Sequence, residues 1–260
     1  MQHNTDGMNN GRRYFALIGD IIDSRHEENR FEVQNKLQAV LSAVNNEQAE
    51  HIAADFLITL GDEFQGLMYA EAGANPIFTA DRIVDEMYPV RIRISIGYGA
   101  IATQIRRDAA IGADGEAFYR ARHGMNLLRA AEKRGRAGSR ILLEAGETEE
   151  CNCCNGKHAA ELETGVNAVL LLLSTLRRSR TARQNAAAAM YVRNAVTGSG
   201  QTQTELAQRL GITQSTFNIS LSVSNAREYA EGLIAAETLL SGLKTGNSAT
   251  DADNEDLRKL

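Results

Sequence analysis

The stretch that most constrains the fold is residues 56–68, where two apolar runs are separated by a glycine and two acids. This pattern predicts two strands joined by a tight turn at Gly61 and Asp62, because glycine supplies the backbone freedom that such a turn requires. The turn would hold Asp62 and Glu63 at the tip of a hairpin, where a divalent ion could reach them.

A second acidic position lies upstream, at the end of an apolar run over residues 14–22. Asp20 ends this predicted strand and Asp23 opens the following loop. If the two strands are neighbours, Asp20 and Asp62 point to one spot, and two converging carboxylates are what Mg²⁺ needs to hold the phosphates of a nucleotide. The alternative is an ordinary hairpin whose acids are simply solvated.

The expected elements follow the order β-α-β-β-α-β, the split unit of ferredoxin-like folds. Periodicity and turn residues place them at 14–22, 28–45, 53–60, 64–68, 76–87 and 90–97, followed by a helix at 116–134 and a strand at 140–143. We therefore predict an α+β domain with an antiparallel sheet and helices on one face. In residues 90–97 isoleucines alternate with polar residues, which indicates one solvent- or partner-facing side. Arg91 and Arg93 would flank the sheet edge or face an anion.

The composition changes after residue 145, and the chain beyond reads as helical. The predicted organisation is a disordered leader at 1–11, the α+β domain at 12–145, a linker at 146–160, a helical domain at 161–241 and a flexible tail at 242–260. The linker contains all three cysteines, in residues 151–154. With His158 they could bind zinc, but adjacent ligands fit a tetrahedral site poorly.

Residues 202–221 are typical of a helix–turn–helix, because apolar residues recur at the spacing that buries them between two short helices. Gly211 would make the turn and Thr213 would cap the second helix. The predicted DNA-contacting residues are Thr213, Gln214, Ser215, Thr216, Asn218 and Arg209. The second helix carries no lysine or arginine, so phosphate contacts would come from Arg209 together with the arginines in 177–183. The alternative is a helical hairpin used for packing or dimerisation.

The overall composition limits the possible partners. The 260-residue chain has a net charge of -5, so no global basic field indicates nucleic-acid binding. No apolar run approaches the ~20 residues that span a bilayer, and the N-terminus lacks the apolar core of a signal peptide. Three clustered cysteines provide no disulfide framework. We therefore expect a soluble cytoplasmic protein with no membrane partner.

Four segments resemble motifs of the SatD family in that family's order: ALIGDIIDSR, FLITLGDEFQGL, RISIGYGAI and AIGADGEAFYRAR. The resemblance covers roughly residues 14–145 and the helix–turn–helix. The same strands and acidic turn also look like the palm of class III nucleotidyl cyclases and GGDEF diguanylate cyclases. This second resemblance implies a palm-like fold that binds a nucleotide with Mg²⁺. Class III palms work as dimers, so it also implies a homodimer.

Carried over by position, the palm resemblance assigns site residues. The implied metal ligands are Asp20, the carbonyl of Ile21 and Asp62, with Glu63 as a further acid. The backbone of Ile22, Asp23, Ser24 and Arg25 would lie near the phosphates, and Arg122 would be the transition-state arginine.

Four positions depart from active cyclases: Phe118 replaces their asparagine, Ile58 their purine-reading lysine, Leu60 the first GGDEF glycine, and Asp23 a loop glycine. These departures favour a nucleotide-binding sensor domain coupled to a DNA-binding domain, as in a transcriptional regulator. Two alternatives remain: a metal-dependent nucleotidyl- or phosphoryl-transfer enzyme, and a non-catalytic interaction protein.

Overall fold

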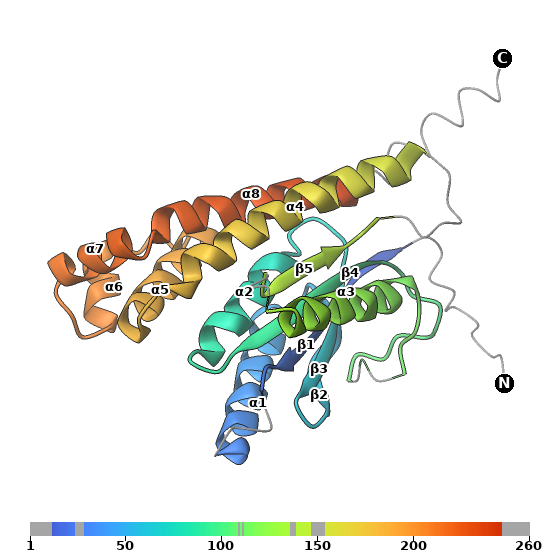
Figure 1. Cartoon of the computed structure of the whole chain (residues 1–260), viewed down its shortest axis with the longest axis horizontal. Helices are drawn as coiled ribbons and strands as arrows, with labels where there is room; N and C mark the ends of the chain where they lie inside the picture. Colours follow the sequence, from blue (N-terminus) through green and yellow to red (C-terminus); the bar gives the residue numbers. More distant parts are fainter. Residues whose placement is uncertain are drawn as a thin grey trace.

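The computed structural model describes residues 12–23, 29–108, 110, 112–135, 139–146 and 154–245. Its elements follow the chain in this order (Figure 1): β1 Arg13–Ile21, α1 Arg30–Glu47, β2 Ile52–Leu60, β3 Glu63–Tyr69, α2 Pro76–Met87, β4 Ile92–Ala100, α3 Glu116–Lys133, β5 Ile141–Glu144, α4 Cys154–Arg178, α5 Ala182–Thr197, α6 Gln203–Arg209, α7 Gln214–Val223 and α8 Ala226–Thr245. The predicted leader and the tail beyond residue 245 lie outside the described residues, whereas residues 242–245 of the predicted tail belong to α8.

The five strands form one sheet in the order β2-β3-β1-β4-β5. β1 pairs antiparallel with β3 and β4, and β2 pairs antiparallel with β3. β5 runs parallel to β4, so the expectation of an antiparallel sheet is wrong at this edge. The reason is that the chain leaves β4, passes through α3 and re-enters the sheet in the same direction, as parallel neighbours require. The α+β class is confirmed.

Helices cover both faces of the sheet, which corrects the prediction of helices on one face. Along β1, Phe15 and Leu17 belong to the core under α1 and α2, whereas Tyr14, Ala16 and Ile18 pack with residues of α3. Both faces of β1 are therefore apolar, and a strand of this kind has to be covered on both sides. Figure 1 shows α3 across the sheet from α1 and α2.

β4 lies directly beneath α3. A Cβ atom on Gly97 would meet the backbone oxygen of Ala117 at 2.1 Å, so a glycine permits this close approach. Ser95 is fully buried and the Arg93 side chain is only 15% exposed. The solvent-facing side predicted for residues 90–97 is therefore absent from β4, because α3 covers it.

α4 closes the β5 edge of the sheet with side-chain hydrogen bonds. The Asn167 amide donates to the backbone oxygen of Leu143 and accepts from its N–H, each at 2.8 Å. A Glu163 oxygen accepts from the N–H of Ala145 at 2.7 Å and from that of Gly146. These side chains satisfy edge groups that would otherwise be open to pairing with another strand.

The C-terminal helices join the core on the α1–α2 face. Val166 and Leu170 of α4 and Leu233 and Leu240 of α8 belong to the same apolar cluster as Phe15 of β1. α4 begins inside the predicted linker, whose residues 147–153 and cysteines 151 and 153 lie outside the described residues. The domain boundary near residue 145 stays a prediction, although the core runs across it.

α5, α6 and α7 have a small core of their own at one end of the long α4–α8 pair (Figure 1). Its fully buried residues are Ala187, Ala188, Leu206, Ala207, Phe217, Leu221 and Ala226.

One helical segment, His158–Arg178 in α4, is long and apolar enough to be a candidate membrane span by length and composition. Within the globular fold, Glu163, Asn167 and Ser174 of this segment form hydrogen bonds to the backbone of residues 140–146. The absence of a membrane partner stays a prediction.

Candidate functional site

The strand register brings three charged residues to one end of the sheet. Asp20, at the end of β1, lies opposite Glu63 on β3 and opposite Arg93 on β4. The turn between β2 and β3 has the predicted glycine conformation, because Gly61 adopts a φ of 65°. Asp62 follows in that turn, where its backbone oxygen accepts from the N–H of Ile21 at 3.2 Å.

Asp20 is 4% exposed and its carboxylate is held by two arginines. Arg93 Nε donates to Oδ1 at 2.5 Å, and Arg129 donates to Oδ2 through Nε at 2.9 Å and Nη2 at 2.6 Å. Arg129 Nη2 also reaches Glu63 at 3.2 Å, and Glu132 pairs with Arg93. Burial disfavours the charge on Arg129, but its bonds to Asp20 and Glu63 outweigh burial and raise its pKa.

This arrangement does not fit a Mg²⁺ ion held by Asp20 and Glu63, because arginines occupy the oxygens that the ion would need. A divalent ion would have to displace Arg93 and Arg129, whose positive charges also repel it. The metal site at Asp20, Ile21, Asp62 and Glu63 therefore stays a prediction that requires these arginines to move.

The predicted phosphate loop follows β1 only as far as the structure describes it. The N–H of Ile22 donates to the backbone oxygen of Arg91 at 2.8 Å. Asp23 adopts a φ of 59°, and its carboxylate pairs with the Arg91 side chain. Ser24 and Arg25 lie outside the described residues.

Arg122 of α3 lies beside the acidic end of the sheet, where its Nη1 donates to Glu63 Oε1 at 2.7 Å. Its side chain is 47% exposed, and Phe118 one turn earlier is buried. Sequence reasoning missed Arg129, which lies seven residues, about two helical turns, after Arg122 and so on the same face of α3. That spacing was the available signal, whereas the pairing of Arg93 with Asp20 depends on strand register.

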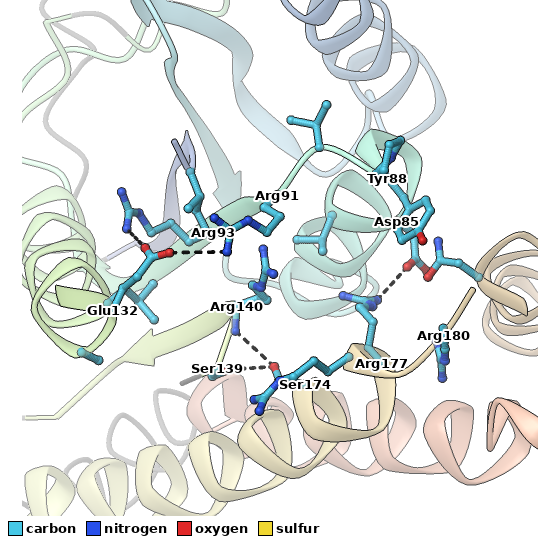
Figure 2. A pocket seen from close by; sticks show the side chains of 18 of the residues that line it. Asp85, Tyr88, Arg91, Arg93, Glu132, Ser139, Arg140, Ser174, Arg177 and Arg180 are labelled. Atoms are coloured by element: carbon cyan, nitrogen blue, oxygen red, sulfur yellow. Dashed lines mark hydrogen bonds and ion pairs between the residues drawn. The ribbon is translucent and has the colours of Figure 1, made fainter. Parts of the chain in front are cut away.

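Beyond Arg93 the surface is hollowed by a cavity of about 580 Å³ between the sheet, α2, α3 and the α4–α5 corner. Among the described residues that line it, six are arginines and two are acids, Asp85 and Glu132; the arginines are Arg91, Arg93, Arg140, Arg177, Arg178 and Arg180. Figure 2 shows Arg93 with Glu132 on one side and Arg177 and Arg180 on the other, with Arg140 between them. The cavity wall is therefore strongly cationic.

A buried charge network borders this cavity. Arg177 Nη2 lies 2.6 Å from Asp81 and 3.0 Å from Asp85 of α2, and the Tyr229 hydroxyl of α8 donates to Asp81 at 2.6 Å. Burial raises the pKa of Asp85 to about 7, against the opposing effect of Arg177. The network ties α2 to α4 and α8.

These positions overturn one sequence expectation. Arg177 and Arg180 were expected to contact DNA phosphates, yet the Arg177 side chain is 12% exposed and Arg180 is 5% exposed. Their side chains point into the protein because α2 and α8 supply acids and an aromatic ring to receive them.

α6 and α7 form the two short helices expected at residues 202–221. Thr202 and Glu205 form a capping box at α6, Gly211 adopts a φ of 65°, and the Thr213 side chain accepts from the N–H of Thr216 at 3.1 Å. The predicted cap at Thr213 is confirmed.

Of the predicted DNA-contacting residues, Thr213, Gln214, Ser215 and Arg209 are exposed, whereas Thr216 and Asn218 are half-buried. Arg209 donates to Gln201 at 3.0 Å, and Arg227 donates to Asn218 at 3.1 Å. The polar first turn of α7 therefore faces outward. Arg209 belongs to α6, and Arg227 of α8 bonds to Asn218 of α7.

The SatD family model matches residues 14–240, so the chain belongs to the SatD family. A search of the curated proteins found no match. Among solved structures the chain is similar to the "Crystal Structure of Regulator of Polyketide Synthase Expression from Bifidobacterium adolescentis", with 15% sequence identity and a TM-score of 0.30. The match covers 91% of this chain and 81% of that chain. At this TM-score the likeness does not establish a shared fold.

Proposed function

We propose that this SatD family protein is a cytoplasmic regulator that binds a nucleotide through its α+β part and DNA through the α6–α7 pair. The observation that carries the proposal is the exposed polar first turn of α7, on a helix pair with its own small core. Gln214 and Ser215 present hydrogen-bonding groups there, as a helix entering a major groove requires.

The strand order supports the nucleotide half of the proposal. β1 to β4 with α1 and α2 follow one another as β-α-β-β-α-β in the sheet order β2-β3-β1-β4, which supports the proposed ferredoxin-like, palm-type unit. Asp20, the Asp23 loop and the Gly61 turn lie at the same end of this sheet. Because arginines neutralise the acids, nucleotide binding without turnover fits this end better than metal-dependent transfer does.

A selection from random DNA duplexes tests the DNA half. We expect an enriched sequence with the wild-type protein, and a loss of preference in a Gln214→Ala, Ser215→Ala double variant at ~1–3 kcal/mol per lost base contact. Ser222→Ala is a matched control, because Ser222 is exposed near the other end of the same helix. If no sequence is enriched and binding at low salt is no tighter than micromolar, DNA binding is wrong.

The phosphate contacts are testable separately. Arg177 and Arg180 are buried, but Arg178 and Arg183 are exposed, so these two remain candidates together with Arg209 and Arg227. Arg209→Ala should weaken binding to all sequences equally and reduce the salt slope by about one unit. A change of sequence preference instead would assign Arg209 to a base.

A second candidate function follows from Ile219 and Val223 of α7, which are 62% and 60% exposed. Apolar side chains on an outer helix face favour a protein contact, and α7 would then be a homodimerisation or docking helix. An Ile219→Ser, Val223→Ser variant distinguishes the two by sedimentation. If the variant loses the dimer but binds DNA as before, α7 uses different faces for the two functions. If the wild-type protein is a monomer, the dimerisation hypothesis is wrong.

A further inference from the structure

The cavity bordered by six arginines shares Ile22, Arg91 and Arg93 with the end of the sheet where the nucleotide is proposed to bind. We infer that this cavity binds a phosphate-bearing small molecule through Arg140 and Arg180. We also infer that binding there changes the DNA affinity of α7. The inference rests on the proposed function for its ligand class and for the role of α7, but the cavity and its charges stand by themselves.

The cavity arginines differ in whether they have a carboxylate partner. Arg91, Arg93 and Arg177 each form ion pairs. Among the residues that the structure describes, no carboxylate lies within ion-pairing distance of Arg140 or Arg180. Anionic groups of a ligand would supply the missing partners, and phosphate oxygens match the planar donor fork of arginine.

Of the two arginines, Arg180 has the greater need of a hydrogen-bond acceptor. It is 5% exposed, and its Nη1 and Nη2 are buried without a hydrogen-bond partner in the described part of the chain. Buried donors without partners are costly, and a charged donor is costlier than a neutral one. Its Nε donates to the backbone oxygen of Ser224 at 3.1 Å, whereas Nη1 and Nη2 are closed to solvent, so a ligand would reach them after a shift of the side chain toward the cavity.

The pKa shifts of Arg140 and Arg180 are consistent with two cations that lack a carboxylate partner. Burial lowers the pKa of Arg140, and the charge of Arg91 lowers it further, whereas Glu132 opposes the shift. Burial also lowers the pKa of Arg180, with Arg177 adding to the effect and Tyr229, Asp85 and Asp81 opposing it. Crowded cations of this kind are relieved by a bound anion.

The dimensions and remaining lining define the ligand class. A cavity of about 580 Å³ lies within the ~300–1,000 Å³ range of small-molecule sites. Besides the arginines, its wall contains apolar and aromatic side chains, including Val84, Tyr88, Pro89 and Leu128. A small organic phosphate with an apolar or ring-shaped portion therefore fits better than inorganic phosphate alone.

Arg180 provides the connection to α7. Ser224, which accepts its Nε–H, is the C-cap residue of α7, and the Arg180 guanidinium lies 4.2 Å from the ring centroid of Tyr229 on α8. An anion bound by Nη1 and Nη2 would hold this side chain and, through it, the α7–α8 junction. Ligand binding should consequently change the affinity of α7 for its DNA site, typically by ~5–150-fold for coupled sites.

The experiment is calorimetric titration of the full-length protein without Mg²⁺, using inorganic phosphate, pyrophosphate, ribose 5-phosphate and ATP as separate probes. We expect saturable binding of at least one organic phosphate, weakened at least tenfold by Arg140→Met. Arg106→Met is the matched control, because Arg106 is an exposed arginine paired with Asp108 and does not contribute to the cavity wall. Preference for ATP over ribose 5-phosphate would identify a nucleotide, and the reverse a sugar phosphate.

Three outcomes overturn the inference: no binding of any probe at millimolar concentration, binding unchanged by Arg140→Met, or binding lost in Asp62→Asn but retained in Arg140→Met. Arg180→Lys, which keeps the charge, tests the second arginine once circular dichroism shows a folded protein. Ligand binding here without any enriched DNA sequence would remove the proposed DNA function and leave the cavity site. Sequence-specific DNA binding that no cavity ligand alters would remove the coupling to α7.

Discussion

Two groups of arginines lie next to each other in this protein and differ in how their charges are balanced. At the end of the sheet, Arg93, Arg122 and Arg129 pair with Asp20, Glu63 and Glu132. In the adjoining cavity, Arg140 and Arg180 have no carboxylate partner among the described residues. We call these the paired cluster and the unpaired arginines.

The difference is the basis for assigning the paired cluster a structural role and for proposing that the unpaired arginines bind a ligand. In the paired cluster the arginines satisfy carboxylates that are partly or fully withdrawn from water, so removing one member leaves an opposite charge behind. Removing an unpaired arginine leaves no such charge. In this structure the acids that looked like metal ligands pair with arginines, so the anion site that we propose lies in the cavity.

The largest expected effect is that of Asp20→Asn. The Asp20 side chain is 6% exposed and Arg93 15% exposed, so we expect the free energy of unfolding to fall by about 3 kcal/mol. This loss is at the low end of the ~3–5 kcal/mol expected when a buried ion pair is broken, because Arg129 is 35% exposed. Urea unfolding measures the change.

The matched variant is Arg140→Met, for which we expect a change within about 0.5 kcal/mol, or a gain in stability. Equal losses for the two variants would erase the distinction between the clusters. If Asp20→Asn instead stabilises the protein and abolishes binding of Mg²⁺, Asp20 is a metal ligand after all.

Asp85, on the cavity wall, gives an effect that depends on pH. Burial raises its pKa to about 7, above its unfolded value, although Arg177 and Arg180 oppose the shift and Asp81 adds to it. The folded state therefore keeps this proton at pH values where the unfolded chain has lost it. Stability should fall as the pH rises from about 4 to about 7, by roughly 1.4 kcal/mol for each pH unit at most, and then level off.

Thermal unfolding across this pH range checks the prediction. Asp85→Asn should flatten the profile, whereas Asp108→Asn, at an exposed ion pair, should leave it unchanged. A wild-type profile that rises with pH would show that Asp85 is ionised in its pair with Arg177.

Within the paired cluster, the smallest expected effect is that of Arg122→Ala. Its side chain is 47% exposed, so its ion pair with Glu63 should contribute only ~0.2–1 kcal/mol by urea unfolding. A loss above about 2 kcal/mol would mean that the cluster acts as one coupled network. Arg122→Lys distinguishes charge from hydrogen-bond geometry, because lysine cannot reproduce the planar fork.

Much of the fold followed from local pattern. Periodicity predicted the order of strands and helices, and the helix expected at 76–87 has the bounds of α2. The covered outer face of β4 could not be predicted in the same way. Residues 90–97 alternate like a half-exposed strand, and only the path of the chain through residues 101–115 brings α3 over them.

The sequence by itself determined features whose partners are a few residues apart: the turn at Gly61, the cap at Thr213 and the burial of Phe217 and Leu221. The tertiary structure decided the chemistry of the site. Asp20 meets Arg93 and Arg129 across 73 and 109 residues of chain, and Arg180 reaches Ser224 across 44. Charge pairing and desolvation depend on distance and burial in space, which the separation of residues along the chain does not specify.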